Sequence, residues 1–332
     1  MSSREPTAVG VRRAVVERPE PRWGGRNLWA VVLAGGEGCR LRPLVRRICG
    51  EERPKQFVAL TDSRTLLRQT LDRIARLIPP ERTVVVSIER HIRYLARELR
   101  DQPHPWVLSQ PESRGTAAGV LFPAHWIRAR DPRAIVAVFP ADHFVDDEES
   151  FMAQVADVAV FGARHPEWIV LLGATATSPE SEYGWIEPGT RMPGSPRASL
   201  YRIRRFVEKP TAEEARSLFA AGCLWNTFVF VSDAATLIGA GRECVPDLHE
   251  RLARISACLG TDREHWAIRQ AYALAPTVNF SRAILQKSSR ALAVSEMAGL
   301  TWCDLGSPER VMKTVAMLGI EPPWAHPQVS IA

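Results

Sequence analysis

Short, unbroken apolar runs alternate along this chain with longer segments whose apolar residues recur at helical spacing. Residues 28–33 read LWAVVL, residues 83–88 read TVVVSI and residues 134–140 read AIVAVFP. Runs of this length that are apolar throughout are typical of strands buried on both faces, as in a parallel sheet. Similar short runs occupy residues 106–110 and 168–174. The segments with helical periodicity lie near residues 65–78, 90–100, 115–130 and 148–164.

This alternation predicts βαβ units and therefore an α/β fold, with a mixed but mostly parallel central sheet and helices on both faces. The second half is less regular. Its expected elements are strands in residues 201–210, 224–231 and 291–297, helices within 234–273 and a last helix over 308–318. No internal repeat or long linker divides the chain. We expect one domain over residues 27–320, a flexible N-terminal arm over 1–26 and a C-terminal tail over 321–332.

The charge balance argues against a nucleic-acid-binding protein. The net charge is +6, but residues 1–26 hold six Arg and three Glu, so half of the excess lies in the arm. The remaining Lys and Arg are scattered rather than gathered into the basic stripe that follows a phosphate backbone. No apolar run approaches the roughly 20 residues that cross a bilayer, and the arm has no apolar stretch typical of a secretory leader. We expect a cytoplasmic protein without a membrane partner.

A glycine-rich loop follows the first expected strand directly, in the sequence AVVLAGGEGCRLRPL. In open α/β sheets, ligands bind beyond the carboxyl ends of the strands. Gly35, Gly36 and Gly38 allow the backbone to approach a triphosphate, with N–H groups facing its oxygens. The loop matches neither the GxGxxG fingerprint, because Leu41 replaces its third glycine, nor the P-loop, which ends in Gly-Lys-Ser/Thr. Taken alone, such a loop is also typical of a simple turn.

Two cations accompany this loop. Arg40 lies within it, and Lys55 follows in ERPKQF, at the end of a polar segment that we interpret as loop throughout. Phosphoryl-type transfer needs little covalent chemistry from the protein, but it needs positioned cations that absorb charge on the phosphorus and the leaving pyrophosphate. We therefore predict catalytic roles for Arg40 and Lys55. The alternative is that both are solvated surface residues.

GGEGCRLRPL followed by RPKQF resembles the signature of sugar-1-phosphate nucleotidyltransferases, and the RPKQF form resembles mannose-1-phosphate guanylyltransferases in particular. The resemblance continues in order through QPESRGTAAGV, FPADHF, SEYGWIEPG, FVEKPT, LWNTFVF, NFSRAILQ and WCDLGS. It implies a Rossmann-like nucleotidyltransferase fold over residues 27–320. It also implies that a nucleoside triphosphate and a sugar 1-phosphate, with GTP and mannose 1-phosphate favoured, form a nucleotide sugar and pyrophosphate.

Two aspartates are the expected metal ligands. Asp142 follows the strand over residues 134–140 in FPADHF, and Asp304 lies in WCDLGS. Mg²⁺ prefers carboxylate, phosphate and water oxygens, and the resemblance implies that the matching aspartates hold this ion together. It would screen the two phosphates from each other. Asp142 also fits a helix cap or a turn. We interpret His143 as structural rather than as a general base, because a phosphate-monoester oxygen needs no base.

The resemblance also assigns the two substrates to separate parts of the chain. Gln110, Gly115 and Thr116 are expected at the nucleobase, although Gly115 and Thr116 equally fit the start of a helix. The residues expected at the sugar 1-phosphate are Tyr183, Gly184, Glu208, Lys209 and Asn226. Glu208 and Asn226 suit hydroxyl groups, whereas Lys209 suits a phosphate. Each of these residues alone also fits an ordinary surface position.

Two positions depart from the pattern of the guanylyltransferases that the chain resembles. Arg42 stands where they usually have Trp, and Phe228 stands where they usually have Gly. Phe228 either reshapes the sugar pocket or points away from it. The alternatives are a transferase of the same fold for another hexose 1-phosphate or base, a metal-dependent glycosyltransferase, and a weakly catalytic paralog that binds sugar nucleotides and regulates a partner. The oligomeric state is open, with a homodimer as one alternative.

Overall fold

The computed structural model describes residues 27–100, 105–192, 199–288, 291–322 and 324. The arm predicted for residues 1–26 lies outside these ranges, as do residues 323 and 325–332 of the predicted tail. Within the described ranges, every helix is too short or too polar to cross a membrane.

A nine-stranded sheet runs through the centre of the molecule in the order β3-β2-β1-β4-β9-β6-β10-β8-β7. Its strands are β1 (Leu28–Leu33), β2 (Thr83–Ile88), β3 (Trp106–Gln110), β4 (Ile135–Pro140), β6 (Ile169–Thr175), β7 (Gly184–Arg191), β8 (Leu200–Glu208), β9 (Leu224–Asp233) and β10 (Leu292–Met297). A small second sheet pairs β5 (Phe144–Val145) with β11 (Trp302–Cys303).

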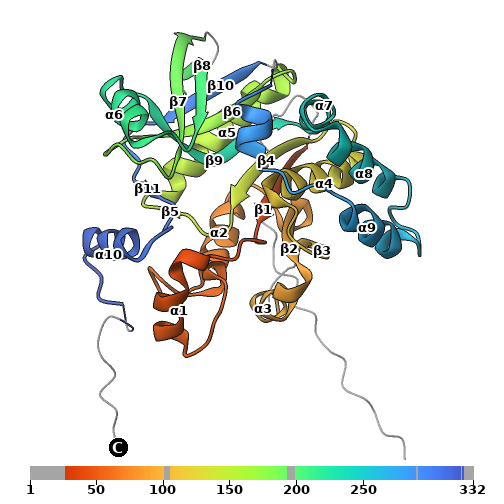
Figure 1. Ribbon diagram of the computed structural model, residues 1–332, viewed down its shortest axis with the longest axis horizontal. Helices are drawn as coiled ribbons and strands as arrows, with labels where there is room; N and C mark the ends of the chain where they lie inside the picture. The colour runs from red at the N-terminus through yellow and green to blue at the C-terminus, as the bar shows by residue number, and fades with distance from the viewer. Residues whose placement is uncertain (1–26, 101–104, 193–198, 289–290, 323, 325–332) are drawn as a thin grey trace, which may run out of the picture.

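From β1 to β6 the helices alternate with the strands of the central sheet as the sequence predicts, whereas β7 and β8 follow β6 without a helix between them (Figure 1). The α-helices are α1 (Arg42–Cys49), α2 (Leu66–Ile74), α3 (Ile92–Glu98), α4 (Gly115–Arg130), α5 (Glu148–Arg164), α6 (Ala212–Ala220), α7 (Ala234–Cys244), α8 (Pro246–Ser256), α9 (Glu264–Ala273) and α10 (Pro308–Met317). Short helical turns are η1 (Cys39–Leu41), η2 (Lys55–Phe57), η3 (Pro80–Arg82), η4 (Glu89–His91) and the π-helical η5 (Ser281–Leu285).

The sheet is mixed, as predicted, and seven of its nine strands, all except β8 and β9, run in the same direction. β1 pairs in parallel with β2 and β4, β2 with β3, and β6 with β10. β9 runs antiparallel between β4 and β6, and β8 runs antiparallel to β10. Because β9 reverses direction, its first residues lie at the same edge of the sheet as the carboxyl ends of β1 and β4.

Helices cover both faces of the sheet, and the residues of β1 alternate between the two covers. Leu28, Ala30 and Val32 pack into the cluster formed with α2, α3 and α5. Trp29 and Val31 pack into the cluster formed with α4, α7, α8 and α9. Successive side chains of a strand point to opposite faces, so an apolar run can fill two cores at once. This arrangement confirms the predicted fold class.

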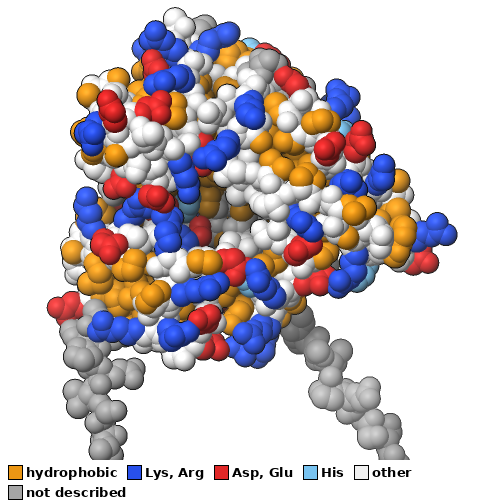
Figure 2. Space-filling view, viewed as in Figure 1, with side chains coloured by type: hydrophobic (Ala, Val, Ile, Leu, Met, Phe, Trp, Pro, Cys, Tyr) orange, Lys and Arg blue, Asp and Glu red, His pale blue; other side chains and the backbone are white. Residues whose placement is uncertain are grey.

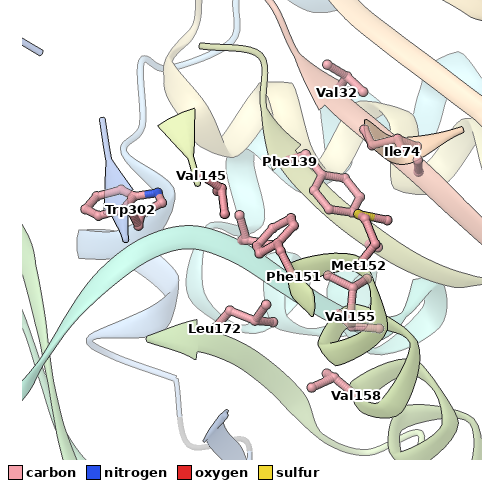
Figure 3. Packing of buried hydrophobic residues seen from close by; sticks show 14 of the residues in the cluster. Val32, Ile74, Phe139, Val145, Phe151, Met152, Val155, Val158, Leu172 and Trp302 are labelled. Carbon is pink, nitrogen blue, oxygen red and sulfur yellow. The ribbon is translucent and has the colours of Figure 1, made fainter. Parts of the chain in front are cut away.

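Helix α5 shows how one such layer is held. Asp147 caps its start by accepting hydrogen bonds from the N–H groups of Glu149 and Ser150. Figure 3 shows Phe151, Met152 and other α5 side chains directed at the sheet. The ring of Phe151 meets that of Phe139 on β4 edge-on, with centroids 6.4 Å apart. Burying one such side chain contributes about 1.5–3 kcal/mol, so the helix is anchored mainly by its apolar face.

The structure contains several elements that the sequence did not predict, among them α6 and the short strands β5 and β11, and two others, α1 and β7, show why. The segment interpreted as loop as far as Lys55 contains α1, which begins with Arg42–Pro43 and ends at Gly50 with φ of +71°. Val45 is the buried residue of this eight-residue helix, too weak an apolar pattern to reveal it. The strand β7 also went unpredicted, because its sequence GWIEPGTR combines Gly and Pro residues with few apolar ones.

Helix α4 is buried along most of its length and carries His125 into its contact with α8. The imidazole Nδ1 lies 3.3 Å from the hydroxyl of Ser256, and the ring is 5.3 Å from that of His249. Burial, aided by the nearby His249 and Arg128, lowers the pKa of His125 to about 4. The folded protein therefore holds this imidazole neutral at pH values where an unfolded chain protonates it.

This depressed pKa predicts an acid-sensitive packing contact. Between about pH 6.5 and pH 4 the unfolded state binds more protons at His125 than the folded state, so stability falls as pH is lowered through that window. His125→Gln should remove about 2 kcal/mol of the difference between the unfolding free energies at pH 7 and pH 4.5. Denaturant titrations at both pH values measure it. His265→Gln, at a side chain that is 74% exposed, is the matched control and should leave the difference unchanged. An unchanged difference in His125→Gln would contradict the prediction.

Candidate active site

A cavity of about 310 Å³ opens at the carboxyl ends of β1 and β4. The amino end of β9 and the paired residues Gly184 and Glu208 of the β7–β8 hairpin form its other side. Figure 2 shows a hollow near the centre of this face with Lys and Arg side chains on its rim. The lining residues are Leu33, Gly36, Thr116, Pro140, Asp142, His143, Glu182, Tyr183, Gly184, Glu208, Asn226, Phe228, Asn279, Ser281, Trp302 and Asp304. Eight of the residues predicted from the sequence are among them: Gly36, Thr116, Asp142, Tyr183, Gly184, Glu208, Asn226 and Asp304.

The glycine-rich loop lies over the end of β1, as predicted. Gln56 holds it there, because its Nε2 donates to the carbonyl oxygens of Ala34 at 2.8 Å and Gly36 at 3.0 Å. Gly38 packs against the backbone of Lys55, so the loop and the RPKQF segment form one unit. Sequence reasoning missed Gln56, although its place beside Lys55 in that segment was the available signal.

The ammonium of Lys55 lies between the two predicted metal-binding aspartates. Its Nζ is 3.2 Å from Oδ2 of Asp142 and donates to the carbonyl oxygen of Asp304 at 2.5 Å. The Lys55 side chain is only 10% exposed, so these two partners offset the cost of burying its charge. Residues from three distant parts of the chain therefore converge at the mouth of the sheet.

The carboxylate of Asp304 is held by several donors. Tyr183 donates its hydroxyl to Oδ1 at 2.9 Å, the N–H of Gly306 donates at 2.9 Å, and Nη1 of Arg310 lies at 3.2 Å. Burial opposes ionisation, but Lys55 and Arg310 outweigh it and lower the pKa of Asp304. Burial raises the pKa of Tyr183, so its phenol remains a donor. Arg310 was not predicted, since a single Arg in α10 carries no distinctive signal.

Asp142 and Asp304 fit a hard divalent cation. Both are acidic oxygen donors lining one cavity, and the charges around Asp304 favour its ionised form. Within the described part of the chain, no group of three or more His, Cys, Asp and Glu residues is placed to hold a metal. A pair of carboxylates suits Mg²⁺, which keeps waters and substrate phosphate oxygens in the rest of its shell.

His143 lies beside Asp142 in a partly buried position, with 14% of its side chain exposed. Its Nδ1 accepts a hydrogen bond from the indole N–H of Trp302 at 3.3 Å, which puts the imidazole proton on Nε2. Burial, only partly opposed by Asp142, lowers the pKa of His143 to about 4. A neutral ring held by Trp302 fits the structural role inferred from the sequence.

At the rim, Arg40 is 52% exposed and pairs with Glu182 at 2.9 Å. Its other terminal nitrogen lies 3.8 Å from Oδ2 of Asp304. Of the two cations predicted to be catalytic, Lys55 therefore lies at the base of the cavity and Arg40 at its entrance. Glu182 lines the cavity and was not predicted from the sequence.

Of the residues predicted to bind the nucleobase, Thr116 reaches the cavity and Gln110 does not. Gln110 is buried behind Gly35 rather than lining the cavity, and its Oε1 accepts from the hydroxyl of Tyr272 at 3.0 Å. Thr116 lines the cavity, and its hydroxyl accepts from the N–H of Phe280 at 2.8 Å. Gln110 and Thr116 therefore each accept a hydrogen bond from another residue of the protein.

Gly115 is required by close packing. Its φ is +78°, and a Cβ there would lie 2.3 Å from the carbonyl oxygen of Val278. That carbonyl accepts from the N–H of Ala117 at 3.0 Å, which docks the 278–280 segment on the first turn of α4. Gly115 thus positions the wall that carries Thr116.

The residues predicted for the sugar lie at the hairpin side. Glu208 lines the cavity, and burial, opposed by Lys209, raises its pKa. A Cβ at Gly184 would lie 2.7 Å from Oε2 of Glu208, so a larger residue there would displace that carboxylate from its present position. Asn226 accepts a hydrogen bond from the N–H of Phe228 at 3.1 Å. Lys209 is exposed and is not among the described residues that line the cavity.

The two departures noted in the sequence occupy different places. Phe228 lines the cavity with φ of +60° and packs against Phe230 and Phe280. Arg42 instead lines a separate depression of about 210 Å³ and pairs with Glu37 at 3.6 Å. Of the two departures, Phe228 is the one that alters this cavity.

Comparison with known proteins agrees with this geometry. A family model described as nucleotidyl transferase matches residues 29–318. The chain is 28% identical over 287 residues to a mannose-1-phosphate guanylyltransferase of Escherichia coli, covering 85% of this chain and 58% of that protein. It is 31% identical over 284 residues to the alginate biosynthesis protein AlgA of Pseudomonas aeruginosa, covering 83% of this chain and 56% of that protein.

Among solved structures, one described as a mannose-1-phosphate geranyltransferase from Thermus thermophilus is 34% identical. The match has a TM-score of 0.72 and covers 84% of this chain and 76% of the other. A structure described as a mannose-6-phosphate isomerase from Helicobacter pylori, 19% identical with a TM-score of 0.66, shows a likeness of fold alone.

This chain belongs to the nucleotidyl transferase family, since the family model spans most of the described residues. The recognition from its motifs is thereby confirmed. The chain spans a little over half the length of the curated relatives it matches, 58% in the case of the Escherichia coli protein.

The packing at Gly115 predicts a large effect of one methyl group. Gly115→Ala should destabilise the protein by about 1–2 kcal/mol through its left-handed backbone and by about 1–3 kcal/mol more through the clash with Val278. Gly222→Ala is the matched control, because Gly222 has φ of +71° but no heavy atom within 4 Å of a built Cβ. Denaturant unfolding of both variants measures the difference, and equal losses would show that the 278–280 segment yields without cost.

Proposed function

We propose that this chain transfers GMP from GTP to mannose 1-phosphate, forming GDP-mannose and releasing pyrophosphate. The observation that carries the proposal is the position of Lys55. Its ammonium joins Asp142 and the Asp304 segment at the mouth of the sheet, between the glycine-rich loop and the side of the cavity that holds Glu208 and Asn226. The similarity to a named mannose-1-phosphate guanylyltransferase supports the choice of substrates.

In the proposed reaction, an oxygen of the sugar phosphate attacks the α-phosphorus of the nucleotide. The bond from that phosphorus to the oxygen bridging to the β-phosphate breaks, and pyrophosphate leaves with the bond electrons. N–H groups of the loop over Gly35, Gly36 and Gly38 would hold the triphosphate. Lys55 and Arg40 would offset the negative charge that grows on the leaving group.

The other lining residues would orient the acceptor. Glu208 and Asn226 would hydrogen-bond hydroxyl groups of the sugar, and Lys209 would meet its phosphate from the rim. Gln110 and Thr116 would contribute to the nucleobase side. Each effect is one of positioning, which lowers the barrier by holding the two phosphates in line.

Members of this family generally depend on a metal ion. For this chain we propose Mg²⁺, held by Asp142 and Asp304 together with substrate phosphates and water. When bound, the ion would neutralise phosphate oxygens that otherwise repel each other. Tyr183 and Arg310 would keep the Asp304 carboxylate fixed and ionised.

A second candidate is a transferase of the same chemistry for another hexose 1-phosphate or base. Phe228 favours this alternative, because a phenyl ring lines the cavity where the similar guanylyltransferases usually have glycine. Both candidates release pyrophosphate, so one screen over substrates distinguishes them.

The first test is a pyrophosphate-release assay over the common nucleoside triphosphates and hexose 1-phosphates. Pyrophosphate should form only when Mg²⁺, a nucleoside triphosphate and a sugar 1-phosphate are all present, with GTP and mannose 1-phosphate as the best pair. Reactions that each omit one component are the controls. Equal release without a sugar phosphate would rule out the proposal, whereas a different best pair would select the second candidate.

Substitution of two lysines separates the halves of the site. Lys55→Ala should lower kcat and impair use of the nucleotide, because its charge acts on the triphosphate. Lys209→Ala should mainly raise KM for the sugar phosphate. A lost charge-assisted contact is worth about 1.5–3 kcal/mol, or roughly ten- to a hundredfold.

Lys313→Ala, at an exposed position of α10, controls for a general loss of charge and should keep the native kinetics. Steady-state kinetics with each substrate varied in turn, together with thermal melting to verify folding, complete the test. The assignment of the two sides is wrong if Lys209→Ala affects only the nucleotide and Lys55→Ala only the sugar phosphate.

A further inference from the structure

Phe228 lies in a β-bulge at the edge of the cavity. Between the pairs Leu171–Phe230 and Gly173–Asn226, one residue of β6 opposes three residues of β9. Phe228 is the middle one of these three and has φ of +60°. A bulky residue rarely adopts this left-handed conformation, because its Cβ approaches the following carbonyl oxygen, whereas glycine adopts it freely.

The protein holds this bulge firmly. Thr227 is completely buried and donates its hydroxyl to the carbonyl oxygen of Leu172 at 2.6 Å. The same hydroxyl accepts from the N–H of Val229 at 3.2 Å, and the N–H of Phe228 donates to Oδ1 of Asn226 at 3.1 Å. Strained residues that are fixed this strongly cluster at functional sites.

The ring of Phe228 has packing partners on one side and the cavity on the other. Its centroid is 5.9 Å from that of Phe230 and 6.0 Å from that of Phe280, both edge-on. Phe230 and Phe280 are fully buried, whereas Phe228 is half-buried and lines the cavity with Asn226 and Glu208. The aromatic contacts therefore fix the ring as part of the cavity wall.

We propose that Phe228 determines which sugar 1-phosphates this chain accepts. Its ring forms an apolar wall beside Asn226 and restricts the acceptor to hexose 1-phosphates with small, uncharged substituents on that side. This inference rests on the proposed nucleotidyl transfer and names a residue that sets its specificity. A charged or bulky polar substituent would lose water against the phenyl ring without gaining a hydrogen-bond partner, or would collide with it.

The experiment compares three acceptors: the best hexose 1-phosphate, N-acetylglucosamine 1-phosphate and glucuronic acid 1-phosphate. The native chain should strongly prefer the first. In Phe228→Gly, kcat/KM for the two larger acceptors should rise relative to the first by about tenfold or more, the size expected when a steric or apolar barrier in a pocket is removed. Phe228→Leu, which keeps an apolar side chain, should give a smaller shift and serves if the glycine variant folds poorly.

Phe230→Leu is the matched control. It removes one contact of the Phe228 ring but leaves that ring in the cavity lining, so its acceptor ratio should shift far less than that of Phe228→Gly. A second measurement isolates the backbone strain: Phe228→Gly should melt at a higher temperature than Phe228→Ala, because both lack the ring but only glycine relieves the left-handed conformation.

The outcomes distinguish a failure of the proposed function from a failure of the inference about Phe228. Absence of pyrophosphate from the native chain with every acceptor would overturn the proposed function. A native chain that is active but uses all three acceptors equally would overturn the inference alone. Unchanged acceptor ratios in both Phe228→Gly and Phe228→Leu would do the same, as would an equal shift in Phe230→Leu.

Discussion

The buried ammonium of Lys55 connects the parts of this molecule that would otherwise be independent. This ammonium contacts Asp142, which follows β4, and the carbonyl oxygen of Asp304. Asp304 lies 249 residues after Lys55 in the chain. A buried charge needs close partners, so the folded state must bring these segments together. Apolar packing of Leu41, Val58 and Leu305 around the same junction stabilises it. Substrate phosphates would then enter a site whose charges are already arranged.

The reversed strand β9 gives the cavity its second side. A purely parallel sheet would present only the carboxyl ends of its strands at this edge. Because β9 lies antiparallel between β4 and β6, its first residues reach the same edge, and Asn226 stands beside Gly173. The β7–β8 hairpin then pairs Gly184 with Glu208 at the adjacent position. One sheet thereby lines the cavity from two sides.

Steric fit at the cavity depends on a few positions where backbone and side chain compete for space. Gly115 and Gly184 leave room for the Val278 carbonyl and the Glu208 carboxylate. Phe228 does the opposite, since it places a large ring where the backbone favours glycine. The strain of the left-handed backbone at Phe228 is offset by ring contacts with Phe230 and Phe280 and by the hydrogen bonds of Thr227. Changes at such positions would alter the cavity wall without removing any contact of Lys55 with Asp142 and Asp304.

The sequence by itself determined the fold class, the early strands of the central sheet at residues such as 28–33 and 83–88, and the family, because apolar periodicity and ordered motifs are local properties. It also indicated eight of the sixteen residues that line the cavity, Asp142 and Asn226 among them. It left α1 and β7 undetected, since their apolar patterns are weak. Only the tertiary structure decided that Gln110 lies behind Gly35, that Lys209 stands outside the lining, and that Arg310 and Tyr183 hold Asp304. Most of these facts depend on contacts between residues far apart in the chain, such as Tyr183 with Asp304, and such contacts are fixed by packing and by the pairing of buried charges rather than by local sequence.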